Sequence, residues 1–173
     1  MDIEISYRPI GIIRTPFREA KDTPIQPAAA GGAEGTVEVS PEYAGGLEDL
    51  EGFSHVMLIY HFHKAEKSGL KVRPFMDSEE RGVFATRAPS RPNRIGISVV
   101  RLLGVKGNVL SIGDADMLDG TPLLDIKPFV PEFDAPAADR IGWLEEQIHR
   151  LNETKDDGRF ERRREHESGD SER

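Results

Sequence analysis

Hydrophobic residues along the chain gather in short runs that are separated by glycine, proline and charged residues. Residues 35–39 alternate with the two-residue period of a half-buried strand, and residues 53–62 form a longer apolar run typical of a buried central strand. Gly107-Asn108 stands between two apolar runs and predicts a tight hairpin turn. The pattern predicts strands at residues 3–13 (broken by Pro9), 35–39, 53–62, 82–86, 95–105, 109–112 and 122–126.

Two further segments have a helical pattern, one of them near the end of the chain. Apolar residues spaced by three or four positions predict an amphipathic helix over residues 137–152, namely Ile141, Leu144, Ile148 and Leu151. Residues 41–50 indicate a shorter helix or turn. Beyond residue 154 almost every residue is charged, glycine or serine, a composition typical of a disordered tail.

These elements favour a mostly β fold. Many short strands with turn signals, followed by one late helix, predict a small single-domain β-barrel with short helical insertions and one C-terminal helix. They do not predict alternating strand–helix units around a parallel sheet. We expect a barrel domain over residues 1–135, a helix packed on the barrel over residues 136–153, and a charged disordered tail over residues 154–173.

The composition limits the classes of function. The chain has 173 residues, no cysteine and a formal net charge of −8. Without cysteine there is no disulfide, thiolate metal site or cysteine nucleophile, which fits a reducing cytoplasm. No apolar run reaches the length of a membrane span, so no membrane association is expected. The acidic balance argues against non-specific coating of nucleic acid, although basic residues gather over residues 64–101.

The most informative stretch is residues 82–96, which we call the arginine loop. It holds Arg87, Arg91 and Arg94 among prolines, between two flanking glycines. Proline restricts φ, so the loop is stiffened before any ligand binds, and the planar guanidinium suits a carboxylate or a phosphate. The alternative is a solvated, charged hairpin tip, and the loop alone does not decide between the two interpretations.

A second candidate is the acidic stretch at residues 113–122, which follows a predicted hairpin strand. Its carboxylates at Asp114 and Asp116 do not match a calcium loop, because Asp119 occupies the position that requires glycine. Two interpretations stay open. The carboxylates accept hydrogen bonds from hydroxyl or ammonium groups of a ligand, or they only form a turn.

Other motifs are weaker. The histidines of the 53–62 run and its end, His55, His61 and His63, could share one face, but so apolar a strand more often carries hydrogen-bonded histidines, and no metal site is predicted. Gln26 stands between two prolines at residues 24–27, and its amide can both donate and accept hydrogen bonds. No dinucleotide-binding glycine motif, Walker loop or Gly-x-Ser-x-Gly motif occurs.

Five stretches in a fixed order carry a family resemblance. They are residues 10–17 (IGIIRTPF), 24–27 (Pro-x-Gln-Pro), 52–63 (GFSHVMLIYHFH), 82–96 (GVFATRAPSRPNRIG) and 118–131 (LDGTPLLDIKPFVP). Together they resemble the TrmO family of S-adenosylmethionine-dependent tRNA methyltransferases. The resemblance implies a β-barrel enzyme that works as a homodimer, with S-adenosyl-L-methionine near the subunit interface. It also implies that N6 of threonylcarbamoyladenosine, beside the anticodon of certain tRNAs, is methylated.

Carried onto this chain, the resemblance implies a set of cofactor contacts: Pro24, Ile25, Gln26, His63, Lys64, Arg87, Ile97, Gly113, Asp114, Ala115 and Asp116. In this set Arg87 would pair with the cofactor carboxylate. Arg91 and Arg94 would bind tRNA phosphates, and Asn93 would hold the loop or meet the base. Asn93-Arg94 departs from the Asn-Pro of many family members, and Ile25 replaces a residue that is basic in bacterial members.

The residue that accepts the proton during methyl transfer is not identified by the sequence. Asp116 and the hydroxyl of Tyr60 are the candidates. Two alternatives to the tRNA enzyme also stay open: an S-adenosylmethionine-dependent methyltransferase with another acceptor, and a cofactor-binding module without catalytic activity.

Overall fold

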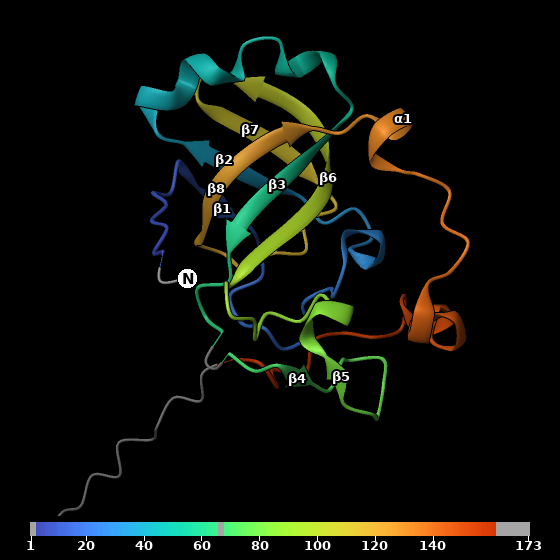
Figure 1. Cartoon of the computed structure of the whole chain (residues 1–173). Helices are drawn as coiled ribbons and strands as arrows, with labels where there is room; N and C mark the ends of the chain where they lie inside the picture. Colours follow the sequence, from blue (N-terminus) through green and yellow to red (C-terminus); the bar gives the residue numbers. More distant parts are fainter. Residues whose placement is uncertain (1–2, 66–67, 162–173) are drawn as a thin grey trace, which may run out of the picture.

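Six antiparallel strands close into a barrel in the computed structural model, which describes residues 3–65 and 68–161 (Figure 1). In order around the barrel these strands are β1 (Gly11–Arg14), β2 (Gly35–Val39), β7 (Val109–Gly113), β6 (Ile95–Lys106), β3 (His55–His61) and β8 (Thr121–Pro128), which pairs again with β1. The predicted mostly β, barrel fold is confirmed. The predicted hairpin turn is also present, with Gly107 at φ +62° between β6 and β7.

The two-residue alternation of the strands builds the core. On β3 the side chains of Val56, Leu58 and Tyr60 are buried, whereas the residues between them are only partly covered. Leu58 pairs across the sheet with Ser98 on β6, whose side chain is also buried. The inward residues of the strands form one hydrophobic cluster inside the closed barrel, and each of the six barrel strands pairs with a neighbour on both sides.

Short 3₁₀ helices cover one end of the barrel, at the top of Figure 1. Pro41–Leu47 and Leu50–Gly52, which connect β2 to β3, bury Leu47 and Leu50 against the core. The prediction of a helix or turn at residues 41–50 is confirmed. A further 3₁₀ helix, Pro27–Ala29, follows the predicted Gln26 motif. The opposite end of the barrel faces the arginine loop.

Two predicted strands are too long. The first begins only at Gly11 rather than at residue 3, because residues 3–9 are exposed and Pro9 has no N–H to donate to a neighbouring strand. The prediction for residues 82–86 is wrong after Gly82. There the chain forms a 3₁₀ helix, Val83–Ala85, because the N–H and the hydroxyl of Thr86 both donate to the Val83 carbonyl. The arginine loop starts from a small sheet made of β4 (Lys71–Val72) and β5 (Arg81–Gly82).

The predicted helix at residues 137–152 is not an α-helix. Its residues form two 3₁₀ helices, Gly142–Glu146 and Ile148–Arg150, because Gly142 at φ +61° lies in the left-handed region and interrupts an α-helix. Over the described residues the one α-helix is α1 (Pro131–Asp134), a single turn. The same described residues contain no helix whose length and apolar character would suit a membrane span.

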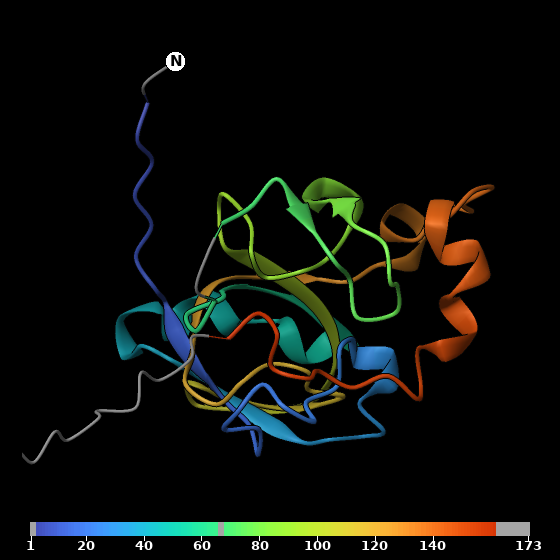
Figure 2. The ribbon, with the colours of Figure 1, turned by 90° about the horizontal axis from the view of Figure 1, so that it is seen from below.

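Residues 155–161, which we call the C-terminal strap, belong to the folded domain. They cross the open end of the barrel (Figure 2), where Lys155 pairs with Pro24 and Glu161 pairs with Ala65. The prediction of a disordered tail is therefore wrong for these residues, because pairing through backbone atoms does not depend on side-chain composition. Residues 162–173, with the arginine run at 162–164, lie outside the described residues.

Candidate active site

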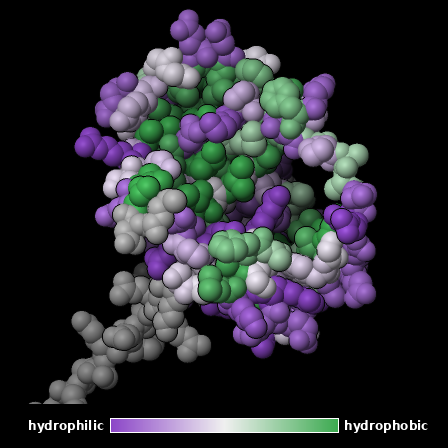
Figure 3. All heavy atoms as spheres, in the orientation of Figure 1, coloured by the Kyte–Doolittle hydropathy of each residue, from purple (hydrophilic) through white to green (hydrophobic). Residues whose placement is uncertain are grey.

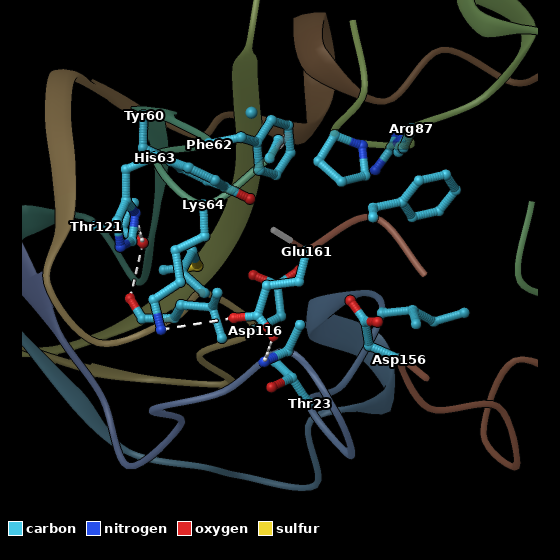
Figure 4. A pocket seen from close by; sticks show the side chains of 18 of the residues that line it. Thr23, Tyr60, Phe62, His63, Lys64, Arg87, Asp116, Thr121, Asp156 and Glu161 are labelled. Atoms are coloured by element: carbon cyan, nitrogen blue, oxygen red, sulfur yellow. Dashed lines mark hydrogen bonds and ion pairs between the residues drawn. The ribbon is translucent and has the colours of Figure 1, made fainter. Parts of the chain in front are cut away.

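The open end of the barrel carries a pocket of about 230 Å³ (Figure 4). Most of its lining comes from five parts of the chain that are distant in sequence: the end of β3 with the residues that follow it, the arginine loop with the start of β6, the loop at residues 20–26, residues 116–121 and the C-terminal strap. Cationic, anionic and aromatic side chains all line it. Such a mixture on a concave surface is typical of a small-molecule site.

Arg87 and Gln26 join two of these walls. The Arg87 guanidinium donates a hydrogen bond to Gln26 Oε1 at 2.8 Å, which links the arginine loop to the loop at residues 20–26. Pro24 and Ile25 line the pocket beside Gln26. A guanidinium has five N–H donors, so Arg87 can bind an anion while it keeps this contact. Both loops were predicted to bind a ligand, and the fold brings them together.

A chain of hydrogen bonds joins two residues that line the pocket, Tyr60 and Asp116, through Ser98. Ser98 Oγ donates to Asp116 Oδ1 at 2.7 Å, and the Tyr60 hydroxyl is 3.0 Å from Ser98 Oγ. Because the single proton of Ser98 goes to Asp116, Tyr60 is the donor to Ser98. Burial raises the pKa of Asp116 to about 7, although the Ser98 hydrogen bond opposes this shift. Burial also raises the pKa of Tyr60, so its hydroxyl stays protonated.

Gly96 on β6 makes room for this chain of hydrogen bonds. A Cβ atom at Gly96 would lie 2.3 Å from Cε2 of Tyr60 and 2.8 Å from Cζ of Phe62. The two rings meet edge to face, with centroids 5.4 Å apart. Only a residue without a side chain lets both rings pack there, which explains a glycine inside a long strand.

His63 and Lys64 follow directly after β3, where they were predicted to meet a ligand. His63 Nδ1 is 3.4 Å from Oγ1 of Thr121 on β8. Burial lowers the pKa of His63 and the positive charge of Lys64 lowers it further, so the imidazole is neutral at pH 7. Lys64 donates to the carbonyl of Arg18, and its ammonium is 3.6 Å from the carboxylate of Glu161.

Three predicted cofactor contacts do not line this pocket: Gly113, Asp114 and Ala115. Ala115 is fully buried, and its N–H donates to the Ala33 carbonyl at 2.9 Å. Asp114 adopts φ +59°, and its Oδ1 accepts from the Gly32 N–H at 3.1 Å. Residues 113–115 therefore form the turn that carries Asp116 into the pocket.

Arg91 holds the arginine loop in shape. One of its guanidinium nitrogens lies 2.9 to 3.4 Å from three carbonyl oxygens of the loop, those of Val83, Thr86 and Ala88. Arg91 was predicted to bind a tRNA phosphate, and its role inside the loop was not predicted. Asn93 and Arg94, the other predicted tRNA contacts, lie just before β6, and the Arg94 carbonyl accepts from the Phe62 N–H at 2.8 Å.

Several pocket residues were not predicted: Ala20, Thr23, Phe62, Phe75, Asp156, Phe160 and Glu161. Phe62 ends the apolar run at residues 53–62 and directly precedes His63, a predicted cofactor contact. This position in the sequence could have indicated that Phe62 lines the site. Phe160 is the only aromatic residue in the charged stretch after residue 154. An isolated aromatic side chain among charges often marks a packing anchor, which the composition argument overlooked.

Metal chemistry has no support within the described parts of the chain. They hold no group of three or more His, Cys, Asp or Glu side chains that could bind a metal ion. The pocket instead carries charges of both signs: Arg87 and Lys64 are cations, Asp116 and Glu161 are acids, and Lys64 forms an ion pair with Glu161. This arrangement suits a zwitterionic or cationic organic molecule that also carries an aromatic group.

The structure is a closed barrel whose open end carries charged and aromatic residues. This places the protein in the class of ligand-binding β-barrel domains, which differ in fold from dinucleotide-binding domains. Residues 12–135 match the family described as the tRNA-methyltransferase O N-terminal domain. The chain belongs to the TrmO family.

The relatives agree with this membership. A Pyrococcus abyssi protein named "Probable S-adenosyl-L-methionine-binding protein" is 63% identical over 160 residues, which is 92% of this chain and 87% of that one. The mouse tRNA (adenine(37)-N6)-methyltransferase is 36% identical over 137 residues, 74% of this chain and 31% of the mouse protein. The crystal structure of TrmO from Pseudomonas aeruginosa has a TM-score of 0.69 and 45% identity over 82% of this chain. This chain spans 63% of the length of that TrmO chain.

Proposed function

We propose that this chain is an S-adenosylmethionine-dependent methyltransferase that acts on N6 of adenine in tRNA, and that its acceptor is threonylcarbamoyladenosine beside the anticodon. Membership of the TrmO family and the names of the relatives support the methyltransferase activity. The finer acceptor follows from the motif resemblance. The observation that carries the proposal is the pocket itself, where the Arg87 loop and Asp116 meet at one end of the barrel.

The side chains of the pocket fit this methyl donor. The donor carries a carboxylate, two cationic groups and an adenine, and when bound it supplies an activated methyl group. Arg87 would bind the carboxylate, since a guanidinium and a carboxylate form strong paired hydrogen bonds. Ile97 and Phe62 would form apolar walls for the adenine ring, and the negative charge of Asp116 would face the sulfonium.

We assign the removal of the N6 proton to Asp116. Ser98 binds Oδ1 of this carboxylate, so Oδ2 is the oxygen that accepts the proton. A carboxylate with a pKa of about 7 is a stronger base than an ordinary aspartate and is still ionised in part at neutral pH. Tyr60 cannot act as this base because its raised pKa keeps it protonated; it orients Ser98 instead.

We further propose that two copies associate through the outer face of β3 and β6. Ile97 and Leu103 on β6 are each 48% exposed, and hydrophobic side chains gather over the barrel strands in Figure 3. Exposed apolar patches of this kind often mark protein interfaces. Because Ile97 also lines the pocket, a second copy would cover one side of it. Light scattering should give the mass of a dimer for the wild type and of a monomer for Leu103→Asp.

The arginine loop is the part of the proposed enzyme that meets tRNA. Arg94 would contact a phosphate, Asn93 would hold the loop or meet the base, and Arg91 would keep the loop in shape besides any phosphate contact. The net charge of −8 does not prevent this binding, because screening limits the reach of distant charges to about 8–10 Å at physiological ionic strength.

The test combines methyl transfer with cofactor binding. Purified protein, labelled S-adenosylmethionine and tRNA from cells that lack this gene should give one labelled nucleoside, identified by mass spectrometry as N6-methylated threonylcarbamoyladenosine. A different labelled nucleoside or small molecule would show another acceptor. Calorimetric binding of S-adenosylhomocysteine without any methyl transfer would favour a non-catalytic module. No binding to the wild type would contradict the proposal as a whole.

A further inference from the structure

The C-terminal strap is attached to the wall of the pocket by its backbone. The Asp22 N–H donates to the Asp156 carbonyl at 2.8 Å, and the Asp156 N–H donates to the Thr23 carbonyl at 3.0 Å. Lys155 and Glu161 pair with Pro24 and with Ala65, so the strap joins the loop at residues 20–26 to the segment after β3. Both of these segments hold predicted cofactor contacts.

Aromatic contacts attach the strap to the arginine-loop side as well. The ring of Phe160 meets that of Phe75 edge to face, with centroids 5.1 Å apart, and packs against a small cluster that includes Val83. The Arg159 guanidinium lies over the same Phe75 ring, 5.2 Å from its centroid. It also donates a hydrogen bond to the Pro74 carbonyl at 3.1 Å. The strap thus connects three walls of the pocket.

The last residue of the strap pairs with a cation of the pocket. The Glu161 carboxylate is 3.6 Å from the Lys64 ammonium and also accepts from the Ala20 N–H at 3.4 Å. Lys64, Glu161 and Asp156 all line the pocket (Figure 4). Without Glu161 the positive charge of Lys64 would face the ligand uncompensated. A cationic ligand would feel this repulsion, and a neutral analogue of it would not.

We propose that residues 155–161 are a structural part of the methyl-donor site and that Glu161, by pairing with Lys64, makes the pocket favour the positively charged donor over its neutral product. The family match ends at residue 135, so these residues lie outside it. This inference rests on the proposed function, since it takes the pocket as the donor site.

Two deletions test the strap. S-Adenosylhomocysteine binding is measured by calorimetry for the full chain, for the chain ending at residue 161 and for the chain ending at residue 154. The first deletion should change the dissociation constant by less than about twofold, and the second should raise it by about tenfold or more, because a pocket wall is lost. Equal affinity of both shortened chains, or tighter binding without the strap, would overturn the inference.

Point variants test the charge without removing the wall. For each protein the affinity for S-adenosylmethionine is divided by the affinity for S-adenosylhomocysteine, which differs in lacking the sulfonium charge. Glu161→Gln should lower this ratio about three- to tenfold, and the double variant Lys64→Met/Glu161→Gln should restore it to within about twofold of the wild type. Glu153→Gln, an exposed acid just before the strap, is the matched control and should leave the ratio unchanged.

The outcomes separate the two proposals. If the full chain binds neither molecule, the proposed function fails and this inference fails with it. If the full chain binds both and Arg87→Ala weakens binding by about tenfold or more, the donor site stands. An unchanged ratio in Glu161→Gln would then overturn the inference about charge on its own.

Discussion

Asp116 allows a quantitative test of the pocket in the absence of any ligand. Its pKa rises from an ordinary 3.8 to about 7 because the carboxyl is buried. One pKa unit corresponds to about 1.4 kcal/mol, so the full shift would amount to about 4 kcal/mol of folding free energy. We take about 2–4 kcal/mol as the expected range, because the residue as a whole keeps some surface exposed to solvent, which screens part of the effect.

The direction of the effect follows from the raised pKa. Between pH 4 and pH 7 the unfolded carboxyl has lost its proton while the folded one still holds it, so the free energy of unfolding falls as the pH rises and levels off above the folded pKa. Asp116→Asn removes this loss but keeps an oxygen that can accept the hydrogen bond from Ser98. The variant should therefore gain about 2–4 kcal/mol relative to the wild type between pH 4 and pH 8.

Urea unfolding of both proteins at several pH values gives this difference directly. The raised pKa of Asp156, to about 6, and the lowered pKa of His63 change the stability of both proteins alike, so they cancel in the comparison. Glu132→Gln, an exposed acid on α1, is the control and should follow the wild type. If the difference between wild type and Asp116→Asn stays constant within about 0.5 kcal/mol over this range, Asp116 is not desolvated and the reasoning fails.

Three further predictions concern the frame of the pocket. Gly96→Ala should destabilise the protein by about 1–3 kcal/mol in urea unfolding because the new Cβ overlaps Tyr60, whereas Gly104→Ala on the same strand has no atom within 4 Å and should cost less than about 1 kcal/mol. Arg91→Ala should lower the free energy of unfolding by about 1–3 kcal/mol and expose the arginine loop to limited proteolysis, since carbonyl groups lose their donor; an unchanged digestion pattern would contradict this role. Arg87→Ala should weaken S-adenosylhomocysteine binding by about tenfold or more in calorimetry with little change in unfolding free energy, and equal affinity would mean that Arg87 is not a ligand contact.

Much of the barrel could be predicted because its signal is local. The apolar runs at residues 95–105 and 53–62 mark β6 and β3 almost to their ends, since each inward side chain must be buried wherever the strand pairs. The helix predicted at 137–152 has the right apolar spacing but the wrong backbone. Leu144, Ile148 and Leu151 do line one cavity with the arginine loop, yet Gly142 turns the chain where an α-helix would continue.

The sequence by itself determined the elements of the barrel, the family and the residue types of the site. These signals are local, because periodicity and motifs depend on residues that are close together in the sequence. Only the tertiary structure decided which of those residues meet. It placed Gln26 in contact with Arg87 and Glu161 in contact with Lys64. It also placed Asp114 and Ala115 in a turn that does not line the pocket. These contacts join segments far apart along the chain through backbone pairing and burial, which no local pattern records.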